Sequence, residues 1–206
     1  GVTAIVDAGL APGIPNFLLG YHDVKGEIDS FEYYVGGLPK NPKPPFNYKA
    51  PFSPVDVIEE YIRPARMKVN GKRITRSALS EIENINFENV GTLEAFNTDG
   101  LRSILVTMDH INNMKEKTLR YPGHAALMAN YRNAGKFDKE RIRKTSDELF
   151  RAWRLEKNEP ELTIMKIIIK IEKSKIEYNL YDEFDVKTGF TSMSRTTGFT
   201  ATATIN

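Results

Sequence analysis

The sequence contains no cysteine, which excludes disulfide bonds and thiolate metal sites and is compatible with a reducing compartment. Its three histidines, His22, His110 and His124, are too scattered to indicate a zinc site, so we expect no bound metal. No apolar run approaches the roughly 20 residues that cross a bilayer, and no signal peptide is visible. We therefore expect a cytoplasmic protein that has no membrane partner.

The sequence also has little excess charge. Lysine and arginine total 29 of the 206 residues and aspartate and glutamate 27, which gives a formal net charge of +2. This charge is too small to indicate binding to nucleic acid, and basic and aromatic residues do not alternate on one face. With 40% hydrophobic and 27% charged residues, the composition is that of an ordinary globular domain with a sizeable core.

The chain begins with the apolar run Val2–Val6, which predicts a buried strand. The run leads through Asp7 into a turn rich in glycine and proline, and a helix is predicted from about Asn16. A strand, a glycine-controlled loop and a helix in this order are the usual way in which an α/β protein builds a ligand site. The loop fits neither phosphate-binding fingerprint, so we expect no pyrophosphate site in this segment.

The rest of the chain reads as alternating strands and helices. Asn70-Gly71 is the strongest hairpin signal, and the proline-rich segment 40–54 predicts either a lid or a stiff surface loop. Strands are predicted at 28–35, 65–69, 72–74, 85–87, 92–96, 116–121, 162–171 and 176–184, and helices at 55–61, 101–109, 124–132, 139–156 and 191–205.

The most apolar strand, 162–171, is followed by the alternating strand 176–184. A long apolar strand beside a half-solvated one needs cover from helices or from a second subunit. We expect a homodimer that forms through this sheet. Because the chain starts on a strand-like run and stops inside a helix-like one, we also expect it to be part of a longer polypeptide.

Polar or glycine- and proline-rich residues follow four of the predicted strands, at Asp7–Asn16, Tyr34–Pro39, Asn97–Gly100 and Arg120–His124. Strand ends that meet at one edge of a sheet form the usual active-site crevice of α/β proteins. We therefore expect these four segments to come together around a ligand.

Candidate chemical groups lie in and near these segments. His124 has the residue type of a general acid or base, with a surface position on a helix as the alternative. Asp7 and Asp99 have the chemistry to accept a proton or hold an amine, and helix capping explains Asp99 equally well. Arg195, among serine and threonine hydroxyls, suits a substrate carboxylate or else pairs with a structural acid.

Five motifs in order carry a resemblance to a known family: DAGLAPGIPNFLLG, YVGGLPKNPKPP, LEAFNTDGL, KTLRYPGH and SMSRTTGFTA. Together they resemble the part of the saccharopine dehydrogenase family that follows its dinucleotide-binding Rossmann domain, and YVGGLP with TLRYPGH is most similar to lysine 6-dehydrogenase-type members. The resemblance covers essentially the whole chain.

The resemblance implies an α/β (α+β) domain with a mixed, largely antiparallel sheet and helices on one face. Residues 1–190 are expected to bind substrate and form a dimer, and residues 191–206 to begin a helix that returns toward the Rossmann domain. The implied chemistry is hydride transfer, with NAD or NADP, at a carbon–nitrogen bond of an amino acid. A non-catalytic binding or assembly module with the same fold is the alternative.

The family's residues carry over by position. Pro12, Gly13 and Asn16 are expected to face the nicotinamide end of the cofactor. The acid or base is expected among His124, Asp99 and Asp7, without a choice between them. The substrate site is expected to include Tyr34, Gly36, Gly37, Asn97, Thr98, Arg120 and Arg195. The exact substrate stays open among lysine, saccharopine, a carboxylated polyamine and another amine.

Overall fold

The structure is a computed structural model that describes residues 1–172 and 174–205. Its centre is a mixed sheet in which β1 (Ile28–Pro39) lies between β6 (Asn113–Arg120) and β7 (Glu161–Ile171). The strand order is β3-β2-β6-β1-β7-β8, and the β4–β5 hairpin pairs with the end of β6. The other strands are β2 (Ala65–Val69), β3 (Lys72–Arg76), β4 (Glu83–Phe87), β5 (Gly91–Asn97) and β8 (Ser174–Glu183).

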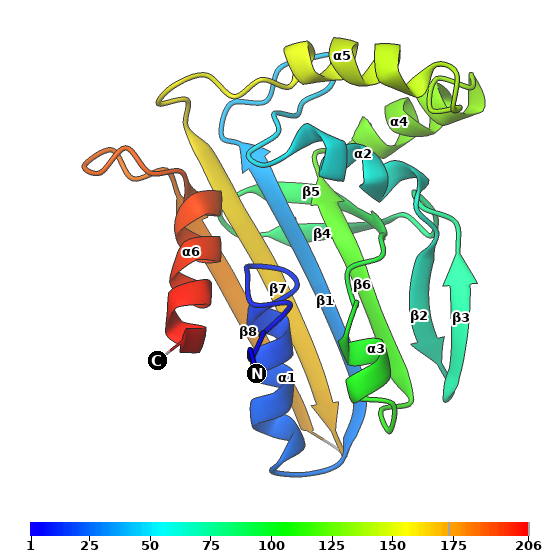
Figure 1. The fold of residues 1–206 in the computed structure, drawn as a ribbon, viewed down its shortest axis with the longest axis vertical. Helices are drawn as coiled ribbons and strands as arrows, with labels where there is room; N and C mark the ends of the chain where they lie inside the picture. The colour runs from blue at the N-terminus through cyan, green and yellow to red at the C-terminus, as the bar shows by residue number, and fades with distance from the viewer. Residues whose placement is uncertain (173, 206) are drawn as a thin grey trace.

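Strand β1 runs parallel to β6, whereas every other strand pairing in the described ranges is antiparallel. In Figure 1 both β1 and β6 point toward the same end of the sheet. A parallel pair cannot be closed by a tight turn, so the chain makes a long excursion through residues 40–112 between them. The predicted mixed, largely antiparallel sheet is confirmed.

Helices cover one face and one end of this sheet (Figure 1). The N-terminal helix α1, the short α3 and the C-terminal α6 lie in front of the strands, which confirms the prediction of helices on one face. The helices α2, α4 and α5 gather at the end toward which β1 and β6 point. Their bounds are α1 Ile14–Asp23, α2 Pro54–Ile62, α3 Ile104–Thr107, α4 His124–Asn133, α5 Ile142–Ala152 and α6 Ser192–Ile205.

Local sequence signals locate most elements correctly. Asn70-Gly71 joins β2 to β3 with both residues at positive φ, as the turn type requires. Pro54 stands at the start of α2, where its missing N–H costs nothing. The strand predicted at Val2–Val6 is wrong: these residues are exposed and adopt no regular structure, because no strand in the described ranges lies beside them to pair with.

Three apolar clusters stabilise the fold. The first lies between the sheet and α1 with α3, and it includes Leu19, Phe31 and Met165. The second joins α2, α4 and α5 around the fully buried Trp153. The third lies on the opposite face of the sheet, where Leu38, Leu119 and Ile164 meet the β4–β5 hairpin. Burial on both faces explains the nearly continuous apolar sequence of β7.

The cover predicted for β7 comes largely from this chain itself. Ile164 is 3% exposed and Ile168 is 8% exposed on the face turned away from α1. Of the large apolar side chains that the structure describes in β7 and β8, only that of Tyr181 is exposed, at 38%. The homodimer through the sheet stays a prediction. Within the described ranges, no helix has both the length and the apolar character to cross a membrane.

Trp153→Ala is expected to lower the free energy of unfolding by about 3–5 kcal/mol, because it leaves a cavity among well-packed aromatic rings. Trp153 packs edge-on against Phe46, Tyr48 and Tyr61, at centroid distances of 5.9, 5.4 and 6.1 Å. Urea denaturation of the two proteins measures the change. Val24→Ala, at a side chain that is 84% exposed, is the control and should change stability by less than about 0.5 kcal/mol.

Candidate active site

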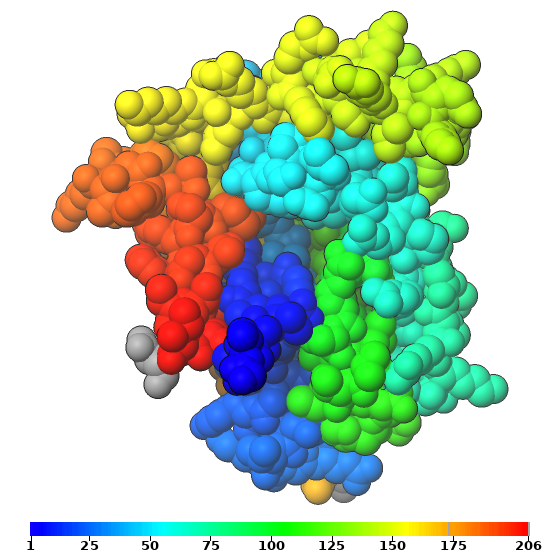
Figure 2. Space-filling model, in the orientation of Figure 1, coloured from blue at the N-terminus to red at the C-terminus, as the bar shows by residue number. Residues whose placement is uncertain are grey.

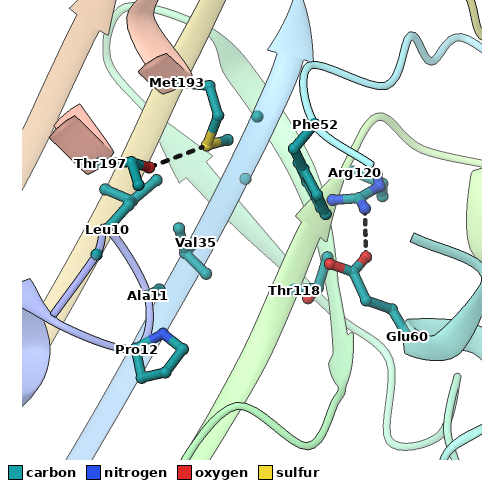
Figure 3. A pocket seen from close by; sticks show the side chains of 13 residues that line it. Leu10, Ala11, Pro12, Val35, Phe52, Glu60, Thr118, Arg120, Met193 and Thr197 are labelled. Carbon is teal, nitrogen blue, oxygen red and sulfur yellow. Dashed lines mark hydrogen bonds and ion pairs between the residues drawn. The ribbon is translucent and has the colours of Figure 1, made fainter. Parts of the chain in front are cut away.

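A cavity of about 350 Å³ opens on the helical face of the sheet, beside the ends of β1 and β6. Four segments that are far apart in the sequence line it: the N-terminal loop, β1, β6 and α6, with α2 and Phe52 closing one side (Figure 3). The lining residues are Gly9, Leu10, Ala11, Pro12, Val35, Gly36, Gly37, Phe52, Glu60, Thr118, Arg120, Met193 and Thr197. Apart from Glu60 and Arg120, these side chains are uncharged, so we call this cavity the apolar part of the cleft.

A second hollow of about 210 Å³ adjoins the first and shares six of its lining residues, so the two form one cleft. Figure 2 shows the recess between the N-terminal segment, α2 and α6. The second hollow is lined by carboxyl groups and two arginines, together with Tyr33, Thr98, Gly100 and Thr118. We call it the acidic part of the cleft; its charged residues are Asp56, Glu59, Glu60, Arg63, Asp99, Arg102 and Glu116.

The parallel pairing of β1 and β6 positions the floor of the cleft. Val35 lies opposite Thr118 in the register, so the neighbouring residues of the two strands reach the same end of the sheet. Alternate residues of a strand share a face, and Glu116, Thr118 and Arg120 accordingly all line the cleft. The sheet therefore presents three polar side chains of β6 in a row along the cleft.

Glycine permits two close approaches around the apolar part. Gly13 has φ +153°, and a Cβ there would lie 1.8 Å from the carbonyl oxygen of Gly9, so the turn before α1 requires glycine. A Cβ on Gly37 would lie 2.5 Å from Cε of Met193. The side chain from α6 can thus rest directly on β1, which brings the C-terminal helix to the cleft.

Arg120 is the most heavily bonded side chain of the site and is 2% exposed. Its Nη2 is 2.5 Å from Oε2 of Glu60, its Nη1 donates to the carbonyl of Leu119, and its Nε lies 3.4 Å from the Tyr61 hydroxyl. The guanidinium also stacks 4.4 Å from the centre of the Tyr48 ring. Burial lowers the pKa of Arg120, but Tyr48, Tyr61 and Glu60 outweigh this effect and raise it, so Arg120 stays charged.

Glu116 is a buried carboxyl group in the acidic part of the cleft. Its Oε2 accepts hydrogen bonds from Oγ1 of Thr98, at 2.6 Å, and from the backbone N–H of Gly100, at 3.0 Å. Burial raises the pKa of Glu116 to about 8, and the nearby Glu60 and Asp99 act in the same direction, while the two hydrogen bonds oppose the shift. At neutral pH this shift favours the protonated form of the group.

The structure brings part of the predicted site together. Glycines of β1, residues of the loop after β5, and single residues of the N-terminal loop and β6 line the cleft: Pro12, Gly36, Gly37, Thr98, Asp99 and Arg120. Asp99 is held by Arg66, whose Nε and Nη2 each lie 2.8 Å from its carboxylate. Asp7 lies beside the cleft and accepts a hydrogen bond from the backbone of Ser103.

Other predicted residues lie outside the cleft. Tyr34 belongs to the apolar cluster on the opposite face of the sheet, and its hydroxyl is 3.4 Å from Glu83. Asn97 donates to Ser80 and Glu81. Gly13 and Asn16 lie at the start of α1, behind the loop residues that line the cleft, and Oδ1 of Asn16 is buried with no hydrogen-bond partner among the described residues.

His124 lies at the start of α4, is 1% exposed and does not line the cleft. Its Nδ1 is 2.8 Å from the carbonyl of Phe46 and its Nε2 is 2.9 Å from the Tyr61 hydroxyl. Burial, aided by the charge of Arg120, lowers the pKa of His124 to about 3, so the ring is neutral. This geometry makes His124 a neighbour that orients Tyr61 against Arg120; its role as an acid or base stays a prediction.

Arg195 turns away from the cleft, although Met193 and Thr197 of the same helix line it. Its guanidinium pairs with Asp182 and lies 3.9 Å from Asp185, so it joins α6 to the end of β8. Of the two alternatives that the sequence left open, these contacts match the pairing with a structural acid.

Sequence reasoning missed Glu60 and Glu116. Glu60 belongs to α2, and no sequence motif marks it as a residue that faces a cleft. Glu116 had a signal, since Glu116, Thr118 and Arg120 place a polar residue at every second position of a central strand. Buried strands seldom carry such a row without a reason in binding or catalysis.

The fold is an α/β domain with a mixed sheet, and a cleft with an apolar part and an acidic part opens on its helical face. Residues 9–206 match the family model described as the saccharopine dehydrogenase C-terminal domain. The chain belongs to this family. The resemblance read from the five motifs is confirmed.

Curated relatives extend the comparison. An alpha-aminoadipic semialdehyde synthase of Arabidopsis thaliana is 31% identical over 155 residues, which are 68% of this chain and 15% of that protein. The mitochondrial alpha-aminoadipic semialdehyde synthase of Rattus norvegicus is 27% identical over 153 residues, 68% of this chain and 16% of that protein. The chain thus spans about a sixth of the curated relatives that it matches.

A solved structure shows the same fold. The apo form of a saccharopine dehydrogenase (L-Glu forming) of Saccharomyces cerevisiae superposes with a TM-score of 0.69 at 18% identity. The superposition covers 96% of this chain and 63% of that protein. The fold of the family is therefore present over nearly the whole chain.

Arg120→Met is expected to lower the free energy of unfolding by about 3–5 kcal/mol, because it leaves Glu60 partly buried without a cation. Adding Glu60→Gln should recover more than half of this loss, since no unpaired charge then remains. Urea denaturation of the wild type, both single variants and the double variant measures the coupling. Simple addition of the two single effects would contradict the expectation.

Glu116→Gln is expected to remove a pH-dependent part of the stability. The pKa of Glu116 is about 8 in the folded chain against an ordinary value of 4.5, so the protonated group's contribution is complete below pH 4.5 and lost as the pH rises to about 8. Relative to the variant, the wild-type free energy of unfolding should fall by about 1.4 kcal/mol per pH unit over this range. Denaturation at a series of pH values measures it, and parallel curves would refute it.

Proposed function

We propose that this chain is the substrate-binding domain of an NAD(P)-dependent oxidoreductase that acts on a carbon–nitrogen bond of an amino acid, of the lysine 6-dehydrogenase or saccharopine dehydrogenase type. The observation that carries this proposal is the single cleft to which all five of the family's motifs contribute. Its two parts differ as the two partners of such a reaction differ: one is mostly apolar, with Glu60 and Arg120 at one side, and the other is lined by five carboxyl groups and two arginines.

The apolar part suits the nicotinamide end of the cofactor. Its walls of Leu10, Ala11, Pro12 and Val35 match a flat, mostly apolar ring, and its volume of about 350 Å³ leaves room for one. In this proposal Pro12 contacts that end, and Gly13 and Asn16 at the start of α1 hold the loop that carries Pro12. When bound, NAD or NADP supplies the hydride acceptor.

The substrate in this proposal lies across both parts. Arg120 binds its carboxylate, since a guanidinium binds a carboxylate in two parallel hydrogen bonds. Glu60 must then give up its contact with Arg120, and the raised pKa of Glu60, caused by burial, favours its release as a neutral acid. Gly36, Gly37 and Thr98 line the path between the ends.

The remaining predicted residues take different places in the proposal. Asp99 is the acid or base candidate that lines the cleft, whereas His124 and Asp7 act from outside its lining. Tyr34, Asn97 and Arg195 contribute through the strands and the helix that they hold in place. This division follows from the contacts described above.

The larger assembly is also a proposal. Residues 1–190 bind substrate and form a homodimer through the sheet, and residues 191–206 lead toward a Rossmann domain that supplies most of the cofactor site. A cytoplasmic location stays a prediction, and the relative from Rattus norvegicus is named as mitochondrial. A non-catalytic binding or assembly module of the same fold is the second candidate, because this chain matches only about a sixth of the length of its curated relatives.

The test uses the full-length protein that contains this chain. NAD and NADP are each supplied with L-lysine, saccharopine or a carboxylated polyamine, and the absorbance of the reduced nicotinamide is followed. We expect reduction with at least one of the amino acids. Bound cofactor without reduction in any mixture would favour the non-catalytic module. The 206-residue chain alone is the control and should be inactive, because it lacks the dinucleotide fingerprint.

A further inference from the structure

The acidic part of the cleft carries an unbalanced charge. Five carboxyl groups and two guanidinium groups line it. Arg63 pairs with Glu59, and Arg120 reaches in from the apolar part to pair with Glu60. Asp99 is neutralised by Arg66, with Arg102 at 4.0 Å. Among the described residues, no ion pair involves the two remaining carboxyl groups, Asp56 and Glu116.

Of these two, Glu116 is the buried one, at 3% exposed, whereas Asp56 is an exposed residue of α2. Burying a carboxyl group without a cation costs free energy, since water no longer stabilises its charge. A glutamine would accept the same two hydrogen bonds without that cost. A site that keeps a carboxyl group here therefore has a use for its charge.

The carboxyl group is also held in one orientation. Both hydrogen bonds, from Thr98 and Gly100, end on Oε2, and no hydrogen bond to Oε1 is found among the described residues. A Cβ on Gly100 would lie 2.6 Å from Cδ of Glu116, so a side chain at Gly100 would displace the carboxyl group from this position. The Tyr33 hydroxyl donates to the carbonyl of Gly100 and fixes the loop from β1.

Glu116 stands at a defined distance from the other charged group on β6. Arg120 follows it by four positions on the same face, which corresponds to about 13 Å between their Cα atoms. Thr118 lies between them and lines both parts of the cleft. Because Arg120 lines the apolar part and Glu116 the acidic part, a ligand that meets both groups extends across the cleft and carries a negative group at one end and a positive group at the other.

We propose that Glu116 is the specificity-determining residue that receives the terminal amino group of a linear amino acid in this cleft. The ammonium group donates to the unoccupied Oε1, and its charge replaces the missing cation. The cleft thereby selects an ω-amino acid such as lysine over an amino acid of the same length without the amine. This inference rests on the proposed function in one respect, that the cleft binds an amino acid.

The raised pKa of Glu116 supports the proposal, because a carboxyl group that burial leaves protonated regains its charge when an ammonium group approaches. The groups that face it from the surrounding elements are Thr98 and Asp99 of the loop after β5, Glu60 of α2, Arg102 before α3 and Tyr33 of β1. Only Arg102 among them is cationic, and it lies nearest to Asp99.

The test compares two ligands that differ in one group. Isothermal titration of the full-length protein measures the affinities for L-lysine and for L-norleucine, which lacks the terminal amine. The wild type should prefer lysine. Glu116→Gln should weaken lysine binding by about 10- to 100-fold, the range for a hydrogen bond to a charged group. Norleucine binding should change by less than about threefold. Glu148→Gln, at an exposed residue of α5, is the charge-matched control and should change neither.

Each outcome decides the question. Equal weakening of both ligands in Glu116→Gln would reveal a merely structural role and overturn the proposal, as would unchanged lysine binding. A wild type that binds neither ligand, or both alike, would also overturn it. Glu116→Asp provides a second variant, because the shortened side chain withdraws the carboxyl group and should weaken lysine alone. Selective lysine binding without any cofactor reduction would support this inference while refuting the catalytic function.

Discussion

The buried guanidinium of Arg120 connects the end of the central sheet to the helices beside it through polar contacts. It extends from the end of β6, pairs with Glu60 of α2, and stacks on Tyr48 of the proline-rich segment. The Tyr61 hydroxyl links it onward to His124 at the start of α4. The layer of helices around Trp153 is thus fixed to the sheet by a charge that also lines the cleft, so the packing of this layer and the shape of the cleft depend on the same side chain.

Burying charged groups is costly, and this cleft limits the cost by pairing three of its five carboxyl groups with arginines. Three ion pairs, those of Glu59, Glu60 and Asp99, balance most of the acidic part. The carboxyl groups without an ion pair among the described residues, Asp56 and Glu116, are available to recognise a ligand. The membership of the saccharopine dehydrogenase C-terminal domain family and the shared fold place this arrangement in a setting where small-molecule binding is expected.

Much of the fold could be predicted because its signals are local: the Asn70-Gly71 turn and the alternation in β8 need no knowledge of distant residues. Val2–Val6 failed because an apolar run becomes a strand only beside a partner. The motif in β6 identified Arg120, but Glu116 went unnoticed because its burial depends on the loop at Gly100. Arg195 pairs with residues of β8, and such tertiary contacts leave no trace in the neighbouring sequence.

The parallel register of β1 and β6 has a consequence for how the domain folds. The two strands can pair only when residues 40–112 between them form a closed loop. Strands β7 and β8, in contrast, follow one another directly in the chain. Closing a long loop costs entropy before any contact repays it, so the pairings of β1 with β6 and with β7 carry a larger closure cost than the local pairing of β7 with β8. The floor of the cleft therefore rests on strands that are far apart in the sequence, and it exists only when the whole central sheet is assembled.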